Sequence, residues 1–202
     1  MKIICIGRNY AEHAKEMNSA IPSEPIFFMK PDVALLKEKE FYYPNFSKDL
    51  HFECEIVVKI DKVGKNIDAN FAHKYYSEFT LGIDFTARDL QAQCKEKGLP
   101  WEKAKAFDNS APISQTWIKF SDVDFATTTF SFFQNGELKQ LGKTEDMIFS
   151  IDQLIAYVSQ YVTLKTGDLI YTGTPSGVGA VKIGDVLTAE LNDQKLFEFH
   201  VK

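Results

Sequence analysis

Residues 51–60 read HFECEIVVKI, and this stretch decides the fold that we expect. Its apolar side chains recur at every second position, as in a strand that buries one face: Phe52, Cys54, Ile56, Val58 and Ile60. Side chains two apart share a face of a strand, so His51, Glu53 and Glu55 should line the other side. The stretch therefore predicts a strand that holds two carboxylates side by side.

Short strands and a few helices are expected around this stretch. Strands are predicted at residues 2–6 and 26–30, the second one stopped by Pro31. A hairpin should turn at Asn135-Gly136, because this dipeptide favours tight hairpin turns. Apolar residues fall at helical intervals in MIFSIDQLIAYVSQYVTL, whereas GDLIYTGTPSGVGAVKIGDVLTAEL returns to short strands.

Capping residues suggest where two further helices begin. Asn9 could cap a helix through YAEHAKEM that ends near Asn18 and Ser19. Thr86 could cap a second helix, with Asp89 completing the capping pattern. Gly98 and Pro100 would end this second helix, and residues 66–78 are also compatible with a helix.

Strands outnumber helices and do not alternate with them regularly. This pattern predicts an α+β, β-rich fold rather than a doubly wound sheet. The 202 residues show no repeat or linker, and 45% of them are hydrophobic, so we expect one domain over residues 1–202.

Charge and cysteine content exclude several classes of function. The net charge is −5 and no basic run occurs, which argues against nucleic-acid binding. The three cysteines are Cys5, Cys54 and Cys94; they form no CxxC pair, which favours a reducing compartment. No segment resembles a signal peptide or a membrane span, so we expect a cytoplasmic protein with no membrane partner.

A third carboxylate could form a site together with Glu53 and Glu55. Asp84 ends the apolar segment FTLGID where a helix should begin, a common place for functional residues. Three carboxylates brought together would repel one another, so such a cluster implies a cation. Oxygen ligands favour Mg²⁺ first, with Mn²⁺ or Ca²⁺ as possible substitutes. The alternative is a strand whose polar face is simply solvated.

His13 and Glu16 lie three residues apart on the first expected helix. This spacing places them on one face, where the carboxylate can orient the imidazole, and such a pair can activate water as a general base. An exposed helical pair is the plainer reading, and Glu12 could also be the neighbour of Glu16 on that face.

Two further segments offer groups for an anionic substrate. Arg88 and Gln91 share a helix face and Lys105 follows in a loop, although such cations are commonly solvated surface groups. GTPSGVG, residues 173–179, matches no nucleotide-binding motif, but its amide groups and Thr174 could form an anion nest. Cys54 is expected to pack in the core.

Read together, these segments resemble the fumarylacetoacetate hydrolase family. The matching segments follow the family's order over nearly the whole chain: GRNYAEHAKEM, FMKP, HFECEIVV, GIDFTARDLQ, KGLPWEKAKAFD, MIFSI and GDLIYTGTPSGVG. The similarity is to the short, single-domain branch that includes acylpyruvases and oxaloacetate decarboxylases.

The resemblance implies a role for each candidate residue. Metal ligands would be Glu53, Glu55 and Asp84. His13 and Glu16 would form a water-activating pair on a lid, and Lys105 would take part in catalysis. Substrate contacts would come from Arg8, Arg88, Gln91 and Thr174. The family's β-rich roll and its usual homodimer are expected as well.

The expected substrates are short 2-oxo acids. Such an acid can chelate Mg²⁺ through its carboxylate and keto oxygens, which eases the cleavage of bonds that leave electrons on C3. The expected reactions are hydrolysis of acylpyruvates and decarboxylation or tautomerisation of oxaloacetate. The alternatives are a 5-carboxymethyl-2-hydroxymuconate-type isomerase or decarboxylase, and a non-catalytic protein that binds metal and oxoacid.

Overall fold

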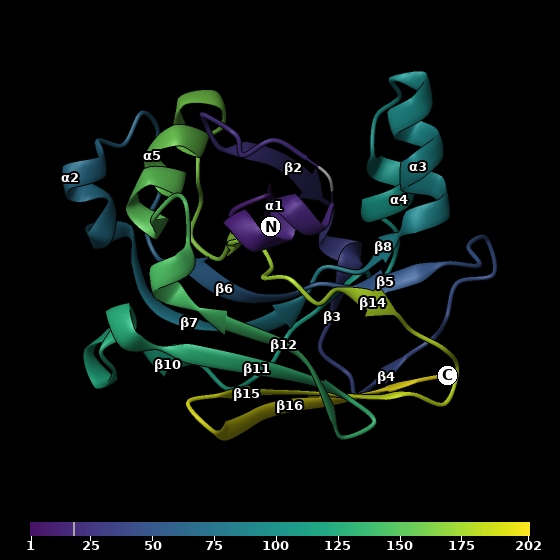
Figure 1. The fold of residues 1–202 in the computed structure, drawn as a ribbon. Coiled ribbons are helices and arrows are strands. Elements are labelled where there is room, and N and C mark those ends of the chain that lie inside the picture. Colours follow the sequence, from purple (N-terminus) through teal and green to yellow (C-terminus); the bar gives the residue numbers. More distant parts are fainter. Residues whose placement is uncertain (18) are drawn as a thin grey trace.

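Two β-sheets make up the body of the protein (Figure 1). The structure is a computed structural model that describes residues 1–17 and 19–202. A six-stranded sheet has the order β10–β7–β6–β13–β1–β2, with bounds β1 Ile3–Gly7, β2 Ile26–Lys30, β6 Cys54–Ile60, β7 Tyr76–Ile83, β10 Ile118–Lys119 and β13 Leu169–Tyr171. A five-stranded sheet has the order β12–β11–β15–β16–β4, with bounds β4 Glu40–Phe41, β11 Thr129–Gln134, β12 Glu137–Lys143, β15 Val186–Leu191 and β16 Gln194–Val201.

Smaller sheets connect to these two. A three-stranded sheet has the order β14–β5–β8, with bounds β5 Leu50–Phe52, β8 Thr86–Ala87 and β14 Gly179–Ala180. A two-stranded sheet joins β3 Leu35–Leu36 to β9 Ala111–Pro112. Both large sheets are mixed, because β1 pairs with β13 and β16 with β4 in parallel while their other pairs are antiparallel. The β-rich α+β prediction is confirmed.

Helices are few and short. The α-helices are α1 Ala11–Glu16, α2 Ala69–Ala72, α3 Arg88–Lys97, α4 Glu102–Lys105 and α5 Ile151–Tyr161. The 3-10 helices are η1 Asp32–Ala34, η2 His73–Tyr75, η3 Phe120–Asp122, η4 Phe125–Thr127 and η5 Thr144–Asp146. Within the described ranges, no helix has the length and apolar character needed to cross a membrane.

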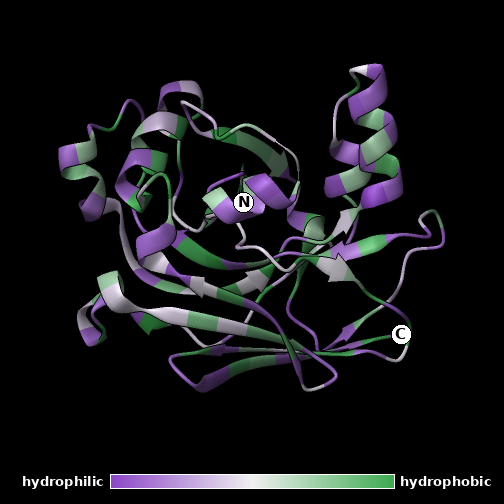
Figure 2. Cartoon of the chain, in the orientation of Figure 1, coloured by the Kyte–Doolittle hydropathy of each residue, from purple (hydrophilic) through white to green (hydrophobic). Residues whose placement is uncertain are grey.

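The central strand β6 carries the core. Every residue of β6 except Lys59 is buried, so the strand is covered on both faces. In Figure 2 the ribbon of β6 is largely green, whereas α3 alternates between purple and green, as a helix with one buried face should. The predicted place of Cys54 in the core is confirmed, and all three cysteines are free and buried.

The predicted strand over residues 51–60 is interrupted at Glu53. Residues on its two sides belong to different sheets, β5 and β6. The helix expected over residues 66–78 is also only partly correct, because α2 and η2 end by Tyr75 and β7 begins at Tyr76.

Two predicted helix caps are wrong. The side chain of Asn9 does not cap α1; it donates to the carbonyls of Thr172 and Phe149 and accepts from the amide of Phe149. Thr86 lies in β8, and α3 begins at Arg88 without a side-chain cap. In both cases contacts with distant segments outweigh the local capping preference. Asn18, at the predicted end of the first helix, lies outside the described residues.

Local signals elsewhere hold. Gly98 ends α3 in the left-handed conformation with φ 63°. The hairpin between β11 and β12 turns at Asn135-Gly136, and Ser150 and Gln153 form a capping box at α5.

Candidate active site

The three predicted acidic residues lie together in the interior. Pairing of β6 with β7 sets Cys54 opposite Ile83, and the amide of Asp84 donates to the carbonyl of Glu53 over 2.8 Å. One carboxylate oxygen from each of Glu53, Glu55 and Asp84 lies within 4.8 Å of the others. Their exposed fractions are 5%, 1% and 1%, so the reading of a solvated polar face is wrong.

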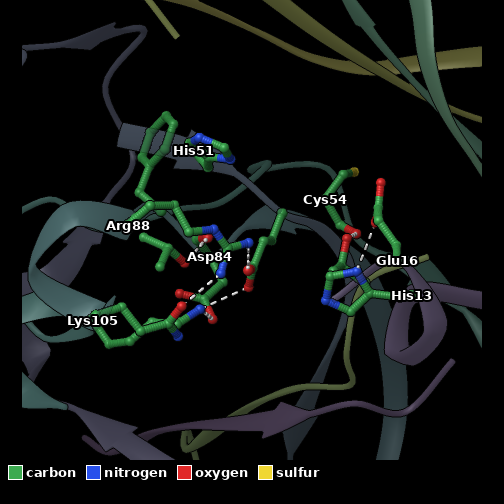
Figure 3. A network of polar contacts seen from close by, with 12 residues as sticks. His13, Glu16, His51, Cys54, Asp84, Arg88 and Lys105 are labelled. Carbon is green, nitrogen blue, oxygen red and sulfur yellow. Dashed lines mark hydrogen bonds and ion pairs between the residues drawn. The ribbon is translucent and has the colours of Figure 1, made fainter. Parts of the chain in front are cut away.

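Chain cations surround two of these carboxylates. Lys105 Nζ lies 2.7 Å from Glu53 Oε2 and 2.8 Å from Asp84 Oδ2. The guanidinium of Arg88 pairs with Glu53 Oε1 and also donates to Gln91 Oε1 over 2.8 Å. Figure 3 shows Arg88, Asp84 and Lys105 joined in this network. The predicted residues of α3 and α4 therefore face the acidic cluster rather than solvent.

Lys30 belongs to the same network and was not predicted. Its Nζ lies 2.7 Å from Asp84 Oδ1 and donates to the carbonyl of Ser110 over 2.7 Å. The side chain is fully buried at the end of β2. The sequence offered one sign of this role, because a lysine ends the otherwise apolar strand IFFMK. A lysine that is buried with such a strand is almost always paired with another group.

The surroundings of the acidic residues shift their pKa values in opposite directions. Burial opposes ionisation of Glu53, but Lys105 and Arg88 outweigh it and hold the pKa of this carboxyl well below its usual range. Burial, and then the carboxylates of Asp84 and Glu53, hold the pKa of Glu55 well above its usual value. Burial alone would lower the pKa of Lys105, but Asp84 and Glu53 raise it. Glu55 is therefore the uncompensated member of the cluster.

The acidic cluster fits a divalent cation. Asp84 Oδ1 is buried and, although close to Lys30, receives no aligned hydrogen bond from any described residue. Glu55 accepts from the amide of Gly173 over 2.7 Å and has no ion pair among residues 1–17 and 19–202. Three converging carboxylates with unfilled acceptor capacity form a donor set for a hard divalent ion.

His13 and Glu16 form a pair at one side of this cluster (Figure 3). His13 Nδ1 lies 3.1 Å from Glu16 Oε2, and the amide of Gly177 donates to Glu16 Oε1 over 3.0 Å. Both oxygens of Glu16 are thus engaged, which fixes the imidazole and leaves its Nε2 atom for chemistry. His13 is buried whereas Glu16 is exposed, so the reading of an exposed helical pair is wrong for His13 only. Glu12 pairs with Lys15 instead.

The GTPSGVG segment holds the site together. Its amides at Gly173 and Gly177 bind carboxylates of the chain itself, Glu55 and Glu16. The hydroxyl of Thr174 donates to the carbonyl of Cys54 over 2.8 Å. The segment was expected to bind an anionic ligand, but it binds two carboxylates of the chain instead. It therefore positions both the acidic cluster and the His13–Glu16 pair.

One cavity gathers nearly all the predicted residues. Those that line it are Arg8, His13, Glu53, Glu55, Asp84, Arg88, Gln91, Lys105 and Thr174. Glu16 lies behind His13 rather than in the lining, and His51 points elsewhere, with Nε2 2.9 Å from Asp49. Arg8 adopts φ 61°, a strained conformation that is common at functional sites. Further residues also line the cavity, and among those that the sequence did not indicate are Lys95 and Trp101.

Comparison with known families and structures agrees with this geometry. The family described as fumarylacetoacetate (FAA) hydrolase C-terminal matches residues 2–202. The chain belongs to the fumarylacetoacetate hydrolase family. The family predicted from the sequence is therefore confirmed, and several of its members are named as enzymes.

Three relatives illustrate the range of the family. The mitochondrial oxaloacetate tautomerase FAHD1 of Mus musculus is 44% identical over 201 residues, covering 99% of this chain and 91% of the relative. The mitochondrial oxaloacetate decarboxylase of Dictyostelium discoideum is 45% identical over 188 residues, covering 92% and 86%. The crystal structure of fumarylpyruvate hydrolase from Pseudomonas aeruginosa with Mn²⁺ and pyruvate has a TM-score of 0.93 at 36% identity, covering 100% and 89%. The chain is thus an enzyme of this family with a buried acidic site suited to a divalent metal.

Proposed function

We propose that the protein is a Mg²⁺-dependent enzyme that acts on short 2-oxo acids, with oxaloacetate first among them. The observation that carries this proposal is that the acidic cluster and the imidazole of His13 line one cavity. The relatives named as oxaloacetate tautomerase and decarboxylase support oxaloacetate.

The ligands of the ion would be Glu53, Glu55 and Asp84. When bound, a divalent ion supplies Lewis acidity toward the carboxylate and keto oxygens of the acid. The imidazole of His13, oriented through Glu16, would take up and return the C3 proton at Nε2. The ammonium of Lys105 would offset negative charge that develops on the substrate.

Acylpyruvate hydrolysis is the second candidate function. The observation that favours it is the anchored His13–Glu16 pair, because hydrolysis needs an activated water and decarboxylation does not. Arg8, Arg88, Gln91 and Thr174 would orient the acid in either reaction.

Three related properties belong to the same proposal. We infer a single catalytic domain over residues 1–202, a homodimer and a cytoplasmic location. The match of the family to residues 2–202 supports the first of these, and the family resemblance supports the second. Mn²⁺ or Ca²⁺ could replace Mg²⁺ at an all-oxygen site.

A substrate panel tests the function. The chelator-treated protein would be assayed with oxaloacetate, acetylpyruvate and 5-carboxymethyl-2-hydroxymuconate, each with and without added Mg²⁺. We expect Mg²⁺-dependent turnover of oxaloacetate and slower hydrolysis of acetylpyruvate. Turnover of the muconate alone would contradict the proposal, and binding of oxalate without any turnover would indicate a non-catalytic binder.

A further inference from the structure

The cavity contains more positive charge than its own acidic residues can pair. The carboxylates of Glu53, Glu55 and Asp84 are matched in number by three chain cations, namely Lys30, Arg88 and Lys105. Arg8 and Lys95 also line the cavity, yet neither forms an ion pair within 4 Å in the described part of the chain. A bound divalent ion would make this excess larger.

Lys95 extends a functional face of α3. Arg88, Gln91 and Lys95 follow the spacing i, i+3, i+7, which places all three along one side of a helix. Arg88 pairs with Glu53 and donates to Gln91, and Lys95 lines the same cavity one turn further along the helix. The exposed side chain of Lys95 therefore lies at the outer part of the cavity.

The surroundings of Lys95 favour the binding of an anion beside its ammonium group. Its Nζ lies 5.8 Å from the ring centroid of Trp101, another lining residue, so that ring flanks the ammonium. Burial lowers the pKa of Lys95, and Arg88 and Arg8 lower it further by repulsion. A negative group placed among these three cations would relieve that repulsion.

We infer that Lys95, together with Arg8, binds the second carboxylate of a 2-oxo dicarboxylic acid whose 1-carboxylate lies at the acidic cluster. This inference rests on the proposed function and narrows its substrate class. Acids with a charged far end would be preferred over acids with a neutral acyl group, because only the former can pair with Lys95. Lys95 is thus a specificity-determining residue and takes no part in bond making or breaking.

Lys97 provides a matched control. It lies in the same last turn of α3 and also complements the helix dipole, but it does not line the cavity. Any effect on helix stability or on overall charge should therefore be the same in Lys95→Met and Lys97→Met.

Steady-state kinetics of the full chain with Mg²⁺ test the inference. For Lys95→Met we expect the KM for oxaloacetate to rise about tenfold, while the KM for acetylpyruvate stays the same. A tenfold loss of affinity is typical when one charge-assisted hydrogen bond is removed. The kcat values should change little, Lys95→Arg should restore the preference, and Lys97→Met should behave as the wild type. An equal effect on both substrates, or no effect on either, would overturn the inference.

Calorimetry gives a readout that does not depend on turnover. The probes are oxalate, which has no distal group, and 3,3-difluorooxaloacetate, which has one and lacks a C3 hydrogen. Lys95→Met should weaken binding of the second probe about tenfold and leave that of oxalate unchanged; equal weakening of both would overturn the inference. If the wild type turned over neither substrate, the proposed function would fail, while these binding constants would still decide the role of Lys95.

Discussion

The backbone amide of Gly177 donates a hydrogen bond of 3.0 Å to Oε1 of Glu16, a residue 161 positions away in the sequence. The same carboxylate contacts the imidazole of His13 through its other oxygen. The glycine-rich segment therefore sets the orientation of the proposed base. This relationship makes Gly177 the most informative position outside the cavity lining.

Substitution of Gly177 by alanine should displace this segment. The residue has φ +95°, and a Cβ atom there would come within 2.0 Å of the carbonyl oxygen of Lys139. We expect the free energy of unfolding to fall by about 1–3 kcal/mol. We also expect kcat to fall, because Glu16 loses its hydrogen bond from the amide of residue 177 and no longer orients His13. Chemical denaturation and steady-state kinetics measure both. Gly136→Ala is the control, because its φ of +81° is also strained but nothing lies within 4 Å of the added atom.

His13→Gln should remove catalysis and retain binding. Loss of a general base typically lowers kcat by about 10²–10⁴-fold. The affinities for Mg²⁺ and oxalate should stay close to those of the wild type, because His13 is not among the three acidic residues that form the candidate metal site. Isothermal titration calorimetry measures these affinities. Glu12→Gln, on the exposed side of α1, serves as the control, and equal loss of activity in both variants would argue against the assignment.

Lys30→Met should destabilise the metal-free protein strongly. The change removes a buried ammonium from Asp84 Oδ1 and leaves that charge less well paired, which typically costs about 3–5 kcal/mol. Urea denaturation in the presence of a chelator measures the effect. Lys59→Met removes a half-exposed pair with Glu78 from the same sheet, and should cost only about 0–1 kcal/mol. Similar costs for the two variants would mean that Lys30 does not balance the charge of Asp84.

The metal-free protein should become less stable as the pH rises from about 4.5. The folded-state pKa of Glu55 is raised above its ordinary value of 4.5, so the folded chain binds the proton of this carboxyl more tightly than the unfolded chain does. The stabilisation is complete below the unfolded-state pKa and is lost as the pH rises through the folded-state pKa. Denaturation with a chelator at several pH values should show this loss, with a slope of at most about 1.4 kcal/mol per pH unit for one group.

Glu55→Gln isolates this contribution. The amide keeps the shape of the side chain and cannot ionise, so the part of the slope due to Glu55 should disappear. Added Mg²⁺ should stabilise the wild type increasingly with pH and should stabilise the variant much less. Identical pH slopes in both proteins would refute a raised pKa at Glu55.

Parts of the fold follow directly from the local sequence. The alternation in HFECEIVVKI predicts a buried strand, Gly98 predicts the end of α3, and Asn135-Gly136 predicts the hairpin. Each of these signals depends on backbone preference or on burial of neighbouring residues, which the sequence displays directly. The acidic cluster could be proposed for the same reason, since Glu53 and Glu55 are two residues apart.

Other parts depend on contacts between distant segments. Asn9 is a good helix cap by local criteria, but its side chain instead joins Thr172 and Phe149. Lys30 reaches Asp84 across 54 positions of sequence, and it was overlooked because a lysine at the end of a strand is ordinary in itself. A buried polar group must find a partner, and which partner it finds depends on how the strands pair.

By itself, then, the sequence determined which segments form strands and helices and which side chains could carry chemistry. Only the tertiary structure decided that Glu16 is held by Gly177, that Lys30 balances Asp84, and that Lys95 faces the cavity. The physical reason is the separation along the sequence over which each kind of interaction acts. Backbone preferences act over a few residues, whereas ion pairs and buried hydrogen bonds act through space between residues that only folding brings together.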